Sequence, residues 1–94
     1  MPAEKYVHRT VFPIEFQKAL IGKECDQAML IRAMIRRGNR ITKQFLNKIA
    51  LGGCRVPAFQ LRKICETLEL DEVGRRRLHW AAALDAGFDL GPIP

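Results

Sequence analysis

The segment from residue 38 to residue 57, GNRITKQFLNKIALGGCRVP, restricts the fold of this chain more than any other. A glycine opens it, Gly-Gly and a proline close it, and Thr42 is placed to cap a helix. At 100° per residue, one side of that helix carries the apolar residues Phe45, Leu46 and Ile49. The other side carries Lys43, Gln44, Asn47 and Lys48. The segment predicts a short amphipathic helix with a basic, amide-rich face.

Two segments before it repeat apolar residues with the same period. The first begins at Pro13, a favourable residue for a first helical turn, and its apolar residues are Phe12, Phe16, Ala19 and Leu20. The second spans residues 27–37, with Asp26 as its cap and Gly38 as the left-handed residue that ends it. Its apolar stripe is Leu30, Ala33 and Met34. Two helices are therefore predicted before the basic one.

Two more helices are predicted after it. Pro57 can open the fourth, whose apolar residues at i, i+3, i+4 and i+7 are Leu61, Ile64, Cys65 and Leu68. Asp71 can cap the fifth, over residues 72–86, and Gly87 ends it. Its main apolar stripe is Val73, Trp80 and Leu84, with Leu78 and Ala81 beside it. Because no stretch alternates with period two, the predicted fold class is all-α, a compact five-helix domain.

Length and composition argue against several other classes of protein. The 94 residues fit one domain, predicted over 12–86 between an N-terminal arm, 1–11, and a C-terminal tail, 87–94. No apolar run approaches the roughly 20 residues that span a bilayer, and the N-terminus lacks the layout of a secretion signal. We therefore expect a cytoplasmic protein without membrane contact. No acid pair, Ser-His-Asp order or phosphate-binding glycine loop occurs, so we do not expect an enzyme.

The cysteines predict neither a disulfide framework nor a metal site. Cys25, Cys54 and Cys65 are odd in number and lack CxxC spacing, and His8 and His79 do not complete a familiar zinc pattern. We expect buried free thiols, with no metal, no cofactor and no small-molecule ligand.

Charge is distributed unevenly along the chain. The formal net charge is +6, and no acidic residue occurs between Asp26 and Glu66. The basic residues of that interval are Arg32, Arg36, Arg37, Arg40, Lys43, Lys48, Arg55, Arg62 and Lys63. The middle of the domain should therefore present a positive field to an anionic partner. Ordinary solvated surface charge is the alternative interpretation of this set.

A helix, a turn that contains Gly38 and a second short amphipathic helix form the layout of a helix-turn-helix. Over about residues 12–86 the chain resembles the lambda-repressor/Cro-like (XRE-type) DNA-binding domains, through ITKQFLNKIALGGCRVPAFQLRKICETLEL and its aliphatic pair, Leu46 and Ile49. The turn GNRI is longer than the family's common turn, and Met34 stands where the family has alanine. Both differences affect the angle between the second and the third predicted helix, and so the assignment of DNA contacts.

The resemblance implies a set of residues that contact DNA. The base-facing residues would be Lys43, Gln44 and Lys48, with Asn47 next to them. Thr42 would cap this recognition helix and contact the phosphate backbone of the DNA. Gln27 and Arg55 match phosphate-contacting positions as well. We assign the arginines of the basic interval, Arg32, Arg36, Arg37 and Arg40, to phosphate as well.

The function implied by the resemblance is that of a sequence-specific double-stranded DNA-binding regulator. It would be a repressor or autorepressor of phage Cro-like, antitoxin-like or anti-CRISPR-associated type, occupying an inverted-repeat operator as a homodimer. Trp80, Leu84 and Phe88 are the candidate dimer surface, unless they complete the core. Two rivals stay open. One is a protein-interaction module, antitoxin or inhibitor, on the same scaffold, and the other is a non-specific nucleic-acid binder.

Two smaller features also allow alternatives. The run Arg75–Arg77, near the start of the fifth predicted helix, fits a phosphate site, an acidic partner or a solvated face beside Glu72. Tyr6, His8 and Arg9 fit an arm that extends along DNA or a disordered tail.

Overall fold

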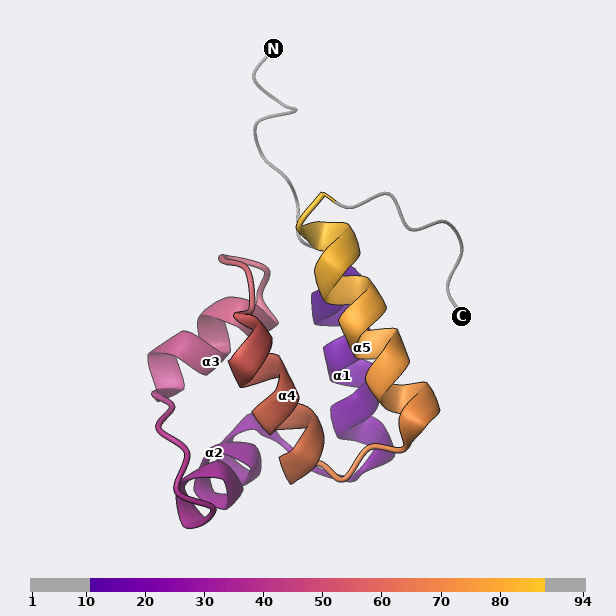
Figure 1. Cartoon of the computed structure of the whole chain (residues 1–94). Helices are drawn as coiled ribbons and strands as arrows, with labels where there is room; N and C mark the ends of the chain where they lie inside the picture. The colour runs from indigo at the N-terminus through magenta and orange to yellow at the C-terminus, as the bar shows by residue number, and fades with distance from the viewer. Residues whose placement is uncertain (1–10, 88–94) are drawn as a thin grey trace.

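The structure is a computed structural model that describes residues 11–87, and over that range the chain is all-helical with no strand. The helices are α1 (Val11–Gly22), α2 (Gln27–Arg36), α3 (Lys43–Ala50), α4 (Ala58–Thr67) and α5 (Glu72–Asp85) (Figure 1). The predicted all-α, five-helix fold is confirmed for these residues. The predicted arm with Tyr6, His8 and Arg9, and Phe88 of the predicted dimer surface, lie outside the described residues.

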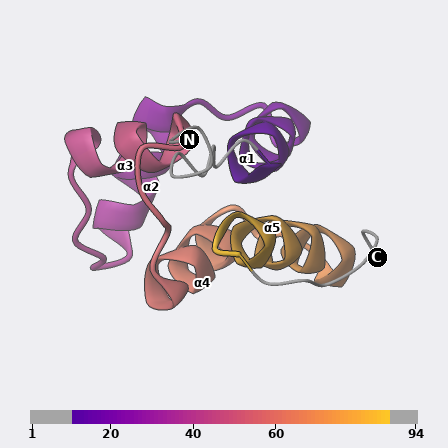
Figure 2. The ribbon, with the colours of Figure 1, turned by 90° about the horizontal axis from the view of Figure 1, so that it is seen from above.

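The five helices form two groups around one core. α1 lies along α5, and α2 contacts both α3 and α4. Contacts of α1 with α3 and of α4 with α5 join the groups. Seen from above, α1 and α5 lie on one side of the molecule and α3 on the other (Figure 2). The largest fully buried side chains come from every helix, and they are Phe16, Leu30, Met34, Leu46, Ile49, Ile64, Leu78 and Cys65.

The predicted helix caps are confirmed. Asp26, Thr42 and Asp71 each accept a hydrogen bond from the backbone N–H three residues further on, at 2.8, 3.0 and 2.8 Å. Gly38 has a left-handed φ of +83°, as its position after α2 predicts. The N–H of Asn39 then donates to the carbonyl of Met34 at 2.9 Å, so a hydrogen-bonded turn ends α2.

The first helix begins at Val11, two residues before its predicted start at Pro13. The reason lies in the last turn of α5. The carboxylate of Asp85 accepts hydrogen bonds from the N–H of Val11, at 3.3 Å, and of Phe12, at 2.8 Å. The first N–H groups of a helix have no partner within it, so a carboxylate at this point stabilises the added turn.

α5 buries the residues beside its predicted main stripe, and of that stripe Trp80 alone packs against the core. Its buried residues are Leu78, Ala81 and Asp85. Val73, in contrast, is 62% exposed, and Trp80 and Leu84 are half-buried. Because Asp85 must face the start of α1 to make its hydrogen bonds, the stripe that shares its side of α5 enters the core.

Candidate nucleic-acid interface

α3 separates its polar and apolar side chains as predicted. Leu46 and Ile49 are 0% and 1% exposed and anchor the helix in the core. The hydroxyl of Thr42 accepts a hydrogen bond from the N–H of Phe45 at 3.0 Å and fixes the first turn. The exposed residues of this helix are Lys43, Gln44, Asn47 and Lys48. The four predicted base-contacting side chains therefore lie together on the solvent-facing side of α3.

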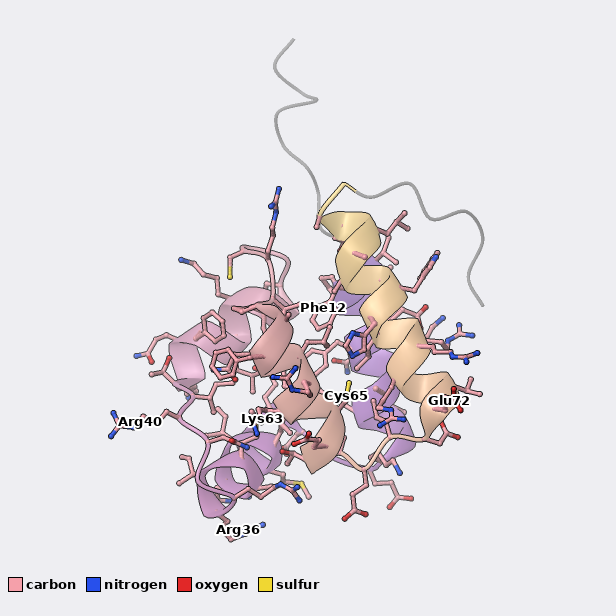
Figure 3. All side chains as sticks on the ribbon, in the orientation of Figure 1. Phe12, Arg36, Arg40, Lys63, Cys65 and Glu72 are labelled. Carbon is pink, nitrogen blue, oxygen red and sulfur yellow. The ribbon has the colours of Figure 1, made fainter. Side chains whose placement is uncertain are left out.

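Several predicted phosphate contacts lie in the segments at either end of α3. Arg37 and Arg40 are exposed in the turn 37–42, and Arg55 is exposed in the loop that leads to α4. Arg40 points away from the domain on the side where α3 lies (Figure 3). Gln27, the first residue of α2, lies outside these two segments and is half-buried, with some access to solvent. These segments place exposed guanidinium groups before and after the polar face of α3.

Arg32 and Arg36 are exposed but lie apart from this group. They line a groove of about 360 Å³ between α2 and the end of α4, together with Leu68 and Glu69. In Figure 3, Arg36 points away from the domain below α2, whereas Arg40 lies beside α3. The predicted phosphate contacts thus divide into one set around α3 and one pair on the α4 side of α2.

The cations around α3 form no ion pair with a carboxylate among the described residues. Among the basic residues between Asp26 and Glu66, the one that forms an ion pair within residues 11–87 is Lys63, which pairs with Glu66 at 3.8 Å. The exposed charges of Lys43, Lys48 and Arg40 are therefore not compensated by any described carboxylate. A polyanion could approach this side without breaking an ion pair of the described chain.

A residue that the sequence analysis did not select, Gln60, connects α4 to the turn before α3. It is 8% exposed, and its Nε2 donates to the backbone carbonyl oxygen of Arg40 at 3.2 Å. Its Oε1 is buried and has no hydrogen-bond partner among the described residues. The sequence carries a signal for its burial, because Gln60 precedes Ile64 by four residues and so continues the apolar stripe of α4. Its partner in the turn has no sequence signal.

The three arginines at the start of α5 have different surroundings. Arg76 donates to Glu72 at 2.7 Å, and Arg77 donates to Glu15 of α1 at 3.2 Å. Arg75 is exposed. Since two of these guanidinium groups have a carboxylate partner, the surroundings favour a solvated face over a phosphate site for this run.

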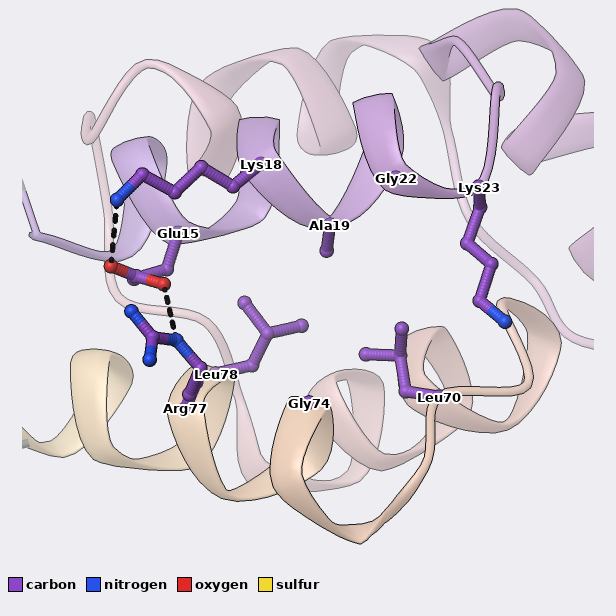
Figure 4. A pocket seen from close by; sticks show the side chains of 9 residues that line it. All are labelled: Glu15, Lys18, Ala19, Gly22, Lys23, Leu70, Gly74, Arg77 and Leu78. Atoms are coloured by element: carbon purple, nitrogen blue, oxygen red, sulfur yellow. Dashed lines mark hydrogen bonds and ion pairs between the residues drawn. The ribbon is translucent and has the colours of Figure 1, made fainter. Parts of the chain in front are cut away.

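A groove of about 340 Å³ lies between α1 and the start of α5 (Figure 4). Its apolar and small lining residues are Ala19, Gly22, Leu70, Gly74 and Leu78, and Lys18, Lys23 and Arg77 also line it. The same two helices expose large apolar side chains, with Ile14, Ile21 and Val73 at 55%, 65% and 62% exposure. Val73 shares its stripe of α5 with Trp80 and Leu84 of the predicted dimer surface.

The described residues contain three free thiols and no helix long enough to cross a membrane. All three cysteines are free, but only Cys65 is buried, whereas Cys25 and Cys54 lie between helices and are half-buried, which corrects the prediction of three buried thiols. Within residues 11–87, no three His, Cys, Asp or Glu side chains are grouped so as to hold a metal ion. The longest described helix has 14 residues, and none could span a bilayer.

Comparison with known proteins adds no relative. No family model matches the chain, and no curated protein or solved structure matches it significantly.

Proposed function

We propose that this protein is a sequence-specific double-stranded DNA-binding regulator of the lambda-repressor/Cro-like, helix-turn-helix type. The observation that carries the proposal is the polar face of α3, where Lys43, Gln44, Asn47 and Lys48 are exposed together. Their helix is anchored by buried Leu46 and Ile49, which hold its backbone in place. A helix in the major groove needs both features, side chains that reach base edges and a fixed position.

The chemistry of the polar face fits recognition of bases. The amide of Gln44 can donate to and accept from an adenine edge, and Lys43 or Lys48 can donate to O6 and N7 of guanine. A good bidentate contact discriminates between bases by about 1–3 kcal/mol. Arg37, Arg40 and Arg55 would contact phosphates and add affinity without sequence information.

The regulator would act as a homodimer that occupies an inverted-repeat operator and blocks transcription. The exposed apolar side chains Ile14, Ile21 and Val73, on the face formed by α1 and α5, support pairing of two copies. In the view from above, α5 and α3 lie on different sides of the molecule (Figure 2), so pairing through α5 would leave the polar face of α3 accessible. The same face would serve the rival function, a protein-interaction module that binds a different protein.

The test is selection of binding sites from a random double-stranded DNA pool at roughly 150 mM salt, followed by titration of variants on the selected site. The double variant Lys43→Ala/Gln44→Ala should lose about 2 kcal/mol or more of preference for that site over unrelated DNA. The control is Gln17→Ala, which removes an exposed amide side chain from α1 and leaves the ion pair between Lys18 and Glu15 in place. We expect the control to keep its preference.

Two outcomes would contradict the proposal. If no palindromic sequence is enriched while the protein still binds all DNA with a steep salt dependence, the chain is a general nucleic-acid binder. If the protein does not bind DNA at all, the chain is a protein-interaction module, and the α1 and α5 face is its candidate binding surface.

A further inference from the structure

The turn between α2 and α3 is longer than the three to four residues of a typical helix-turn-helix, since it covers residues 37–42. Local hydrogen bonds hold only its two ends. At the first end, the N–H of Asn39 donates to the carbonyl oxygen of Met34. At the second end, the hydroxyl of Thr42 caps α3. Between these ends lie Arg40 and Ile41, which make no local backbone hydrogen bond in the described residues. A long turn of this kind leaves the direction of the following helix undetermined by local bonds.

Gln60 supplies the hydrogen bond that reaches the middle of this turn. Its Nε2 donates to the carbonyl oxygen of Arg40 at 3.2 Å, two residues before the cap of α3. The donor stands on α4, and its neighbours Leu61 and Ile64 are buried in the core. The carbonyl of Arg40 is therefore tied to a rigid part of the domain, while the half-buried side chain of Ile41 packs on the core beside it.

Stability alone does not account for an amide at this position. Gln60 is 8% exposed, and its Oε1 is buried with no partner among the described residues. Burying an unpaired polar atom is unfavourable, and an apolar side chain of the same length would avoid this cost. The hydrogen bond to the turn is the interaction that an apolar side chain cannot replace.

We propose that Gln60 is a positioning residue that sets the direction in which α3 presents its polar face. This inference rests on the proposed function and deepens it, because it explains how a turn longer than usual can still hold a recognition helix in register. Without the bond, the backbone at Arg40 and at the start of α3 would move more freely, although Leu46 and Ile49 still hold the helix on the core. Contacts to base edges tolerate such movement poorly, whereas phosphate contacts through long, flexible side chains tolerate it well.

The test compares Gln60→Met with Thr67→Val. Met has a similar length and no donor, and Thr67→Val removes a different side-chain hydrogen bond of α4, from Thr67 Oγ1 to the carbonyl of Lys63 at 2.7 Å. Hydrogen exchange in the free protein is followed at the amides of Asn39 and Phe45, which flank Arg40. We expect Gln60→Met to speed exchange at both by about tenfold, through more frequent local opening, and Thr67→Val to leave both unchanged.

Binding to the selected site and to unrelated DNA is then measured for both variants. Gln60→Met should lower the ratio of the two affinities by about tenfold while its affinity for unrelated DNA stays within about twofold of wild type. Thr67→Val should keep the wild-type ratio. Unchanged exchange at Asn39 and Phe45 in Gln60→Met, or an unchanged affinity ratio, would overturn the inference about Gln60.

The failure of this inference is distinguishable from failure of the proposed function. If wild type selects no DNA sequence, the proposed function is wrong, and the assigned role of Gln60 in recognition is wrong with it, even if exchange shows that it holds the turn. If Gln60→Met does not fold, wild type still provides a test. The side-chain amide protons of Gln60 must be protected from exchange, and rapid exchange there would overturn the assignment.

Discussion

At the scale of single residues, two glutamates occupy backbone conformations that suit glycine. Glu24 and Glu69 have φ values of 51° and 54°, each in the turn that follows a helix. Around Glu69, the N–H of Leu70 donates to Cys65 at 3.1 Å, the bond expected when a left-handed residue ends a helix. Gly22 is the last residue of α1, and the left-handed residue of the turn that follows is Glu24.

Replacing Glu69 by glycine should stabilise the fold. A non-glycine residue in the left-handed region costs about 1–2 kcal/mol, part of which glycine recovers after its own entropy cost. We expect Glu69→Gly to raise the free energy of unfolding by about 0.5–1 kcal/mol and the Tm by about 3–6 °C. Glu69→Ala removes the carboxylate but keeps the left-handed φ, so it is the control in thermal unfolding. A Tm for the glycine variant no higher than that of the alanine variant would contradict the strain argument.

Burial raises the pKa of the Cys65 thiol to about 11, although Arg75 partly offsets it. At pH 8 only about one thiol in a thousand would then be ionised, so Cys65 should react with a thiol reagent far more slowly than Cys54. In urea the three thiols should react alike. Because the unfolded thiol ionises first, the same shift should also lower stability as the pH rises from 9.0 to about 11. Equal native rates at Cys54 and Cys65 would refute the burial of Cys65.

At the scale of elements, the contact between α1 and α5 depends on polar groups as well as on apolar packing. Asp85 is 6% exposed and accepts hydrogen bonds from the first two N–H groups of α1. Further along, Glu15 of α1 pairs with Arg77 of α5 at 3.2 Å. These contacts hold the start of α1 at the end of α5, so the two helices run antiparallel with a defined register.

Asp85→Ala should destabilise the fold by about 2 kcal/mol, since it leaves two N–H groups at a helix end without their charged acceptor. Asp71→Ala is a suitable comparison because Asp71 caps α5 locally at an exposed position, where the loss of a cap costs about 1 kcal/mol. Urea unfolding measures both. If Asp85→Ala costs no more than Asp71→Ala, the capping of α1 by α5 is not an important source of stability.

At the scale of the whole molecule, the exposed cations around α3 and the exposed apolar side chains of α1 and α5 belong to different helices. The basic residues that form no ion pair lie on α3 and in the segments beside it, while Glu24, Glu69 and Asp71 lie in the turns after α1 and α4. Lys23 joins those two turns by donating from Nζ to the carbonyl of Glu69 at 3.2 Å. Large apolar side chains are exposed on α1 and α5, and also at Met29, Ile35, Leu51 and Phe59 of the other segments. An anionic partner at α3 and an apolar partner at α1 and α5 would therefore contact different helices.

Val73→Glu should weaken pairing of two copies without disturbing the fold, because the side chain is 62% exposed and a carboxylate would lie on the paired apolar face. Sedimentation equilibrium should show a dimer for wild type and a monomer for the variant at the same concentration. Ile35→Glu is the matched control, since Ile35 is 57% exposed on α2, and it should remain dimeric. A monomeric wild type, or equal effects of both variants, would argue against this face.

The sequence by itself determined the five helices apart from the start of α1, their caps at Asp26, Thr42 and Asp71, and the polar face of α3. These features depend on residues within a few positions of one another, and so local periodicity and capping chemistry are sufficient to predict them.

Only the tertiary structure decided which face of α5 is buried, that Asp85 caps α1, and that Gln60 holds the turn before α3. Asp85 and its partner Phe12 are 73 residues apart in the chain, and Gln60 and Arg40 are 20 apart. The residues next to a polar side chain in the sequence do not predict which distant backbone group it will hydrogen-bond. Such partners exist only once the helices have packed, because packing alone brings a distant N–H or carbonyl within hydrogen-bond distance.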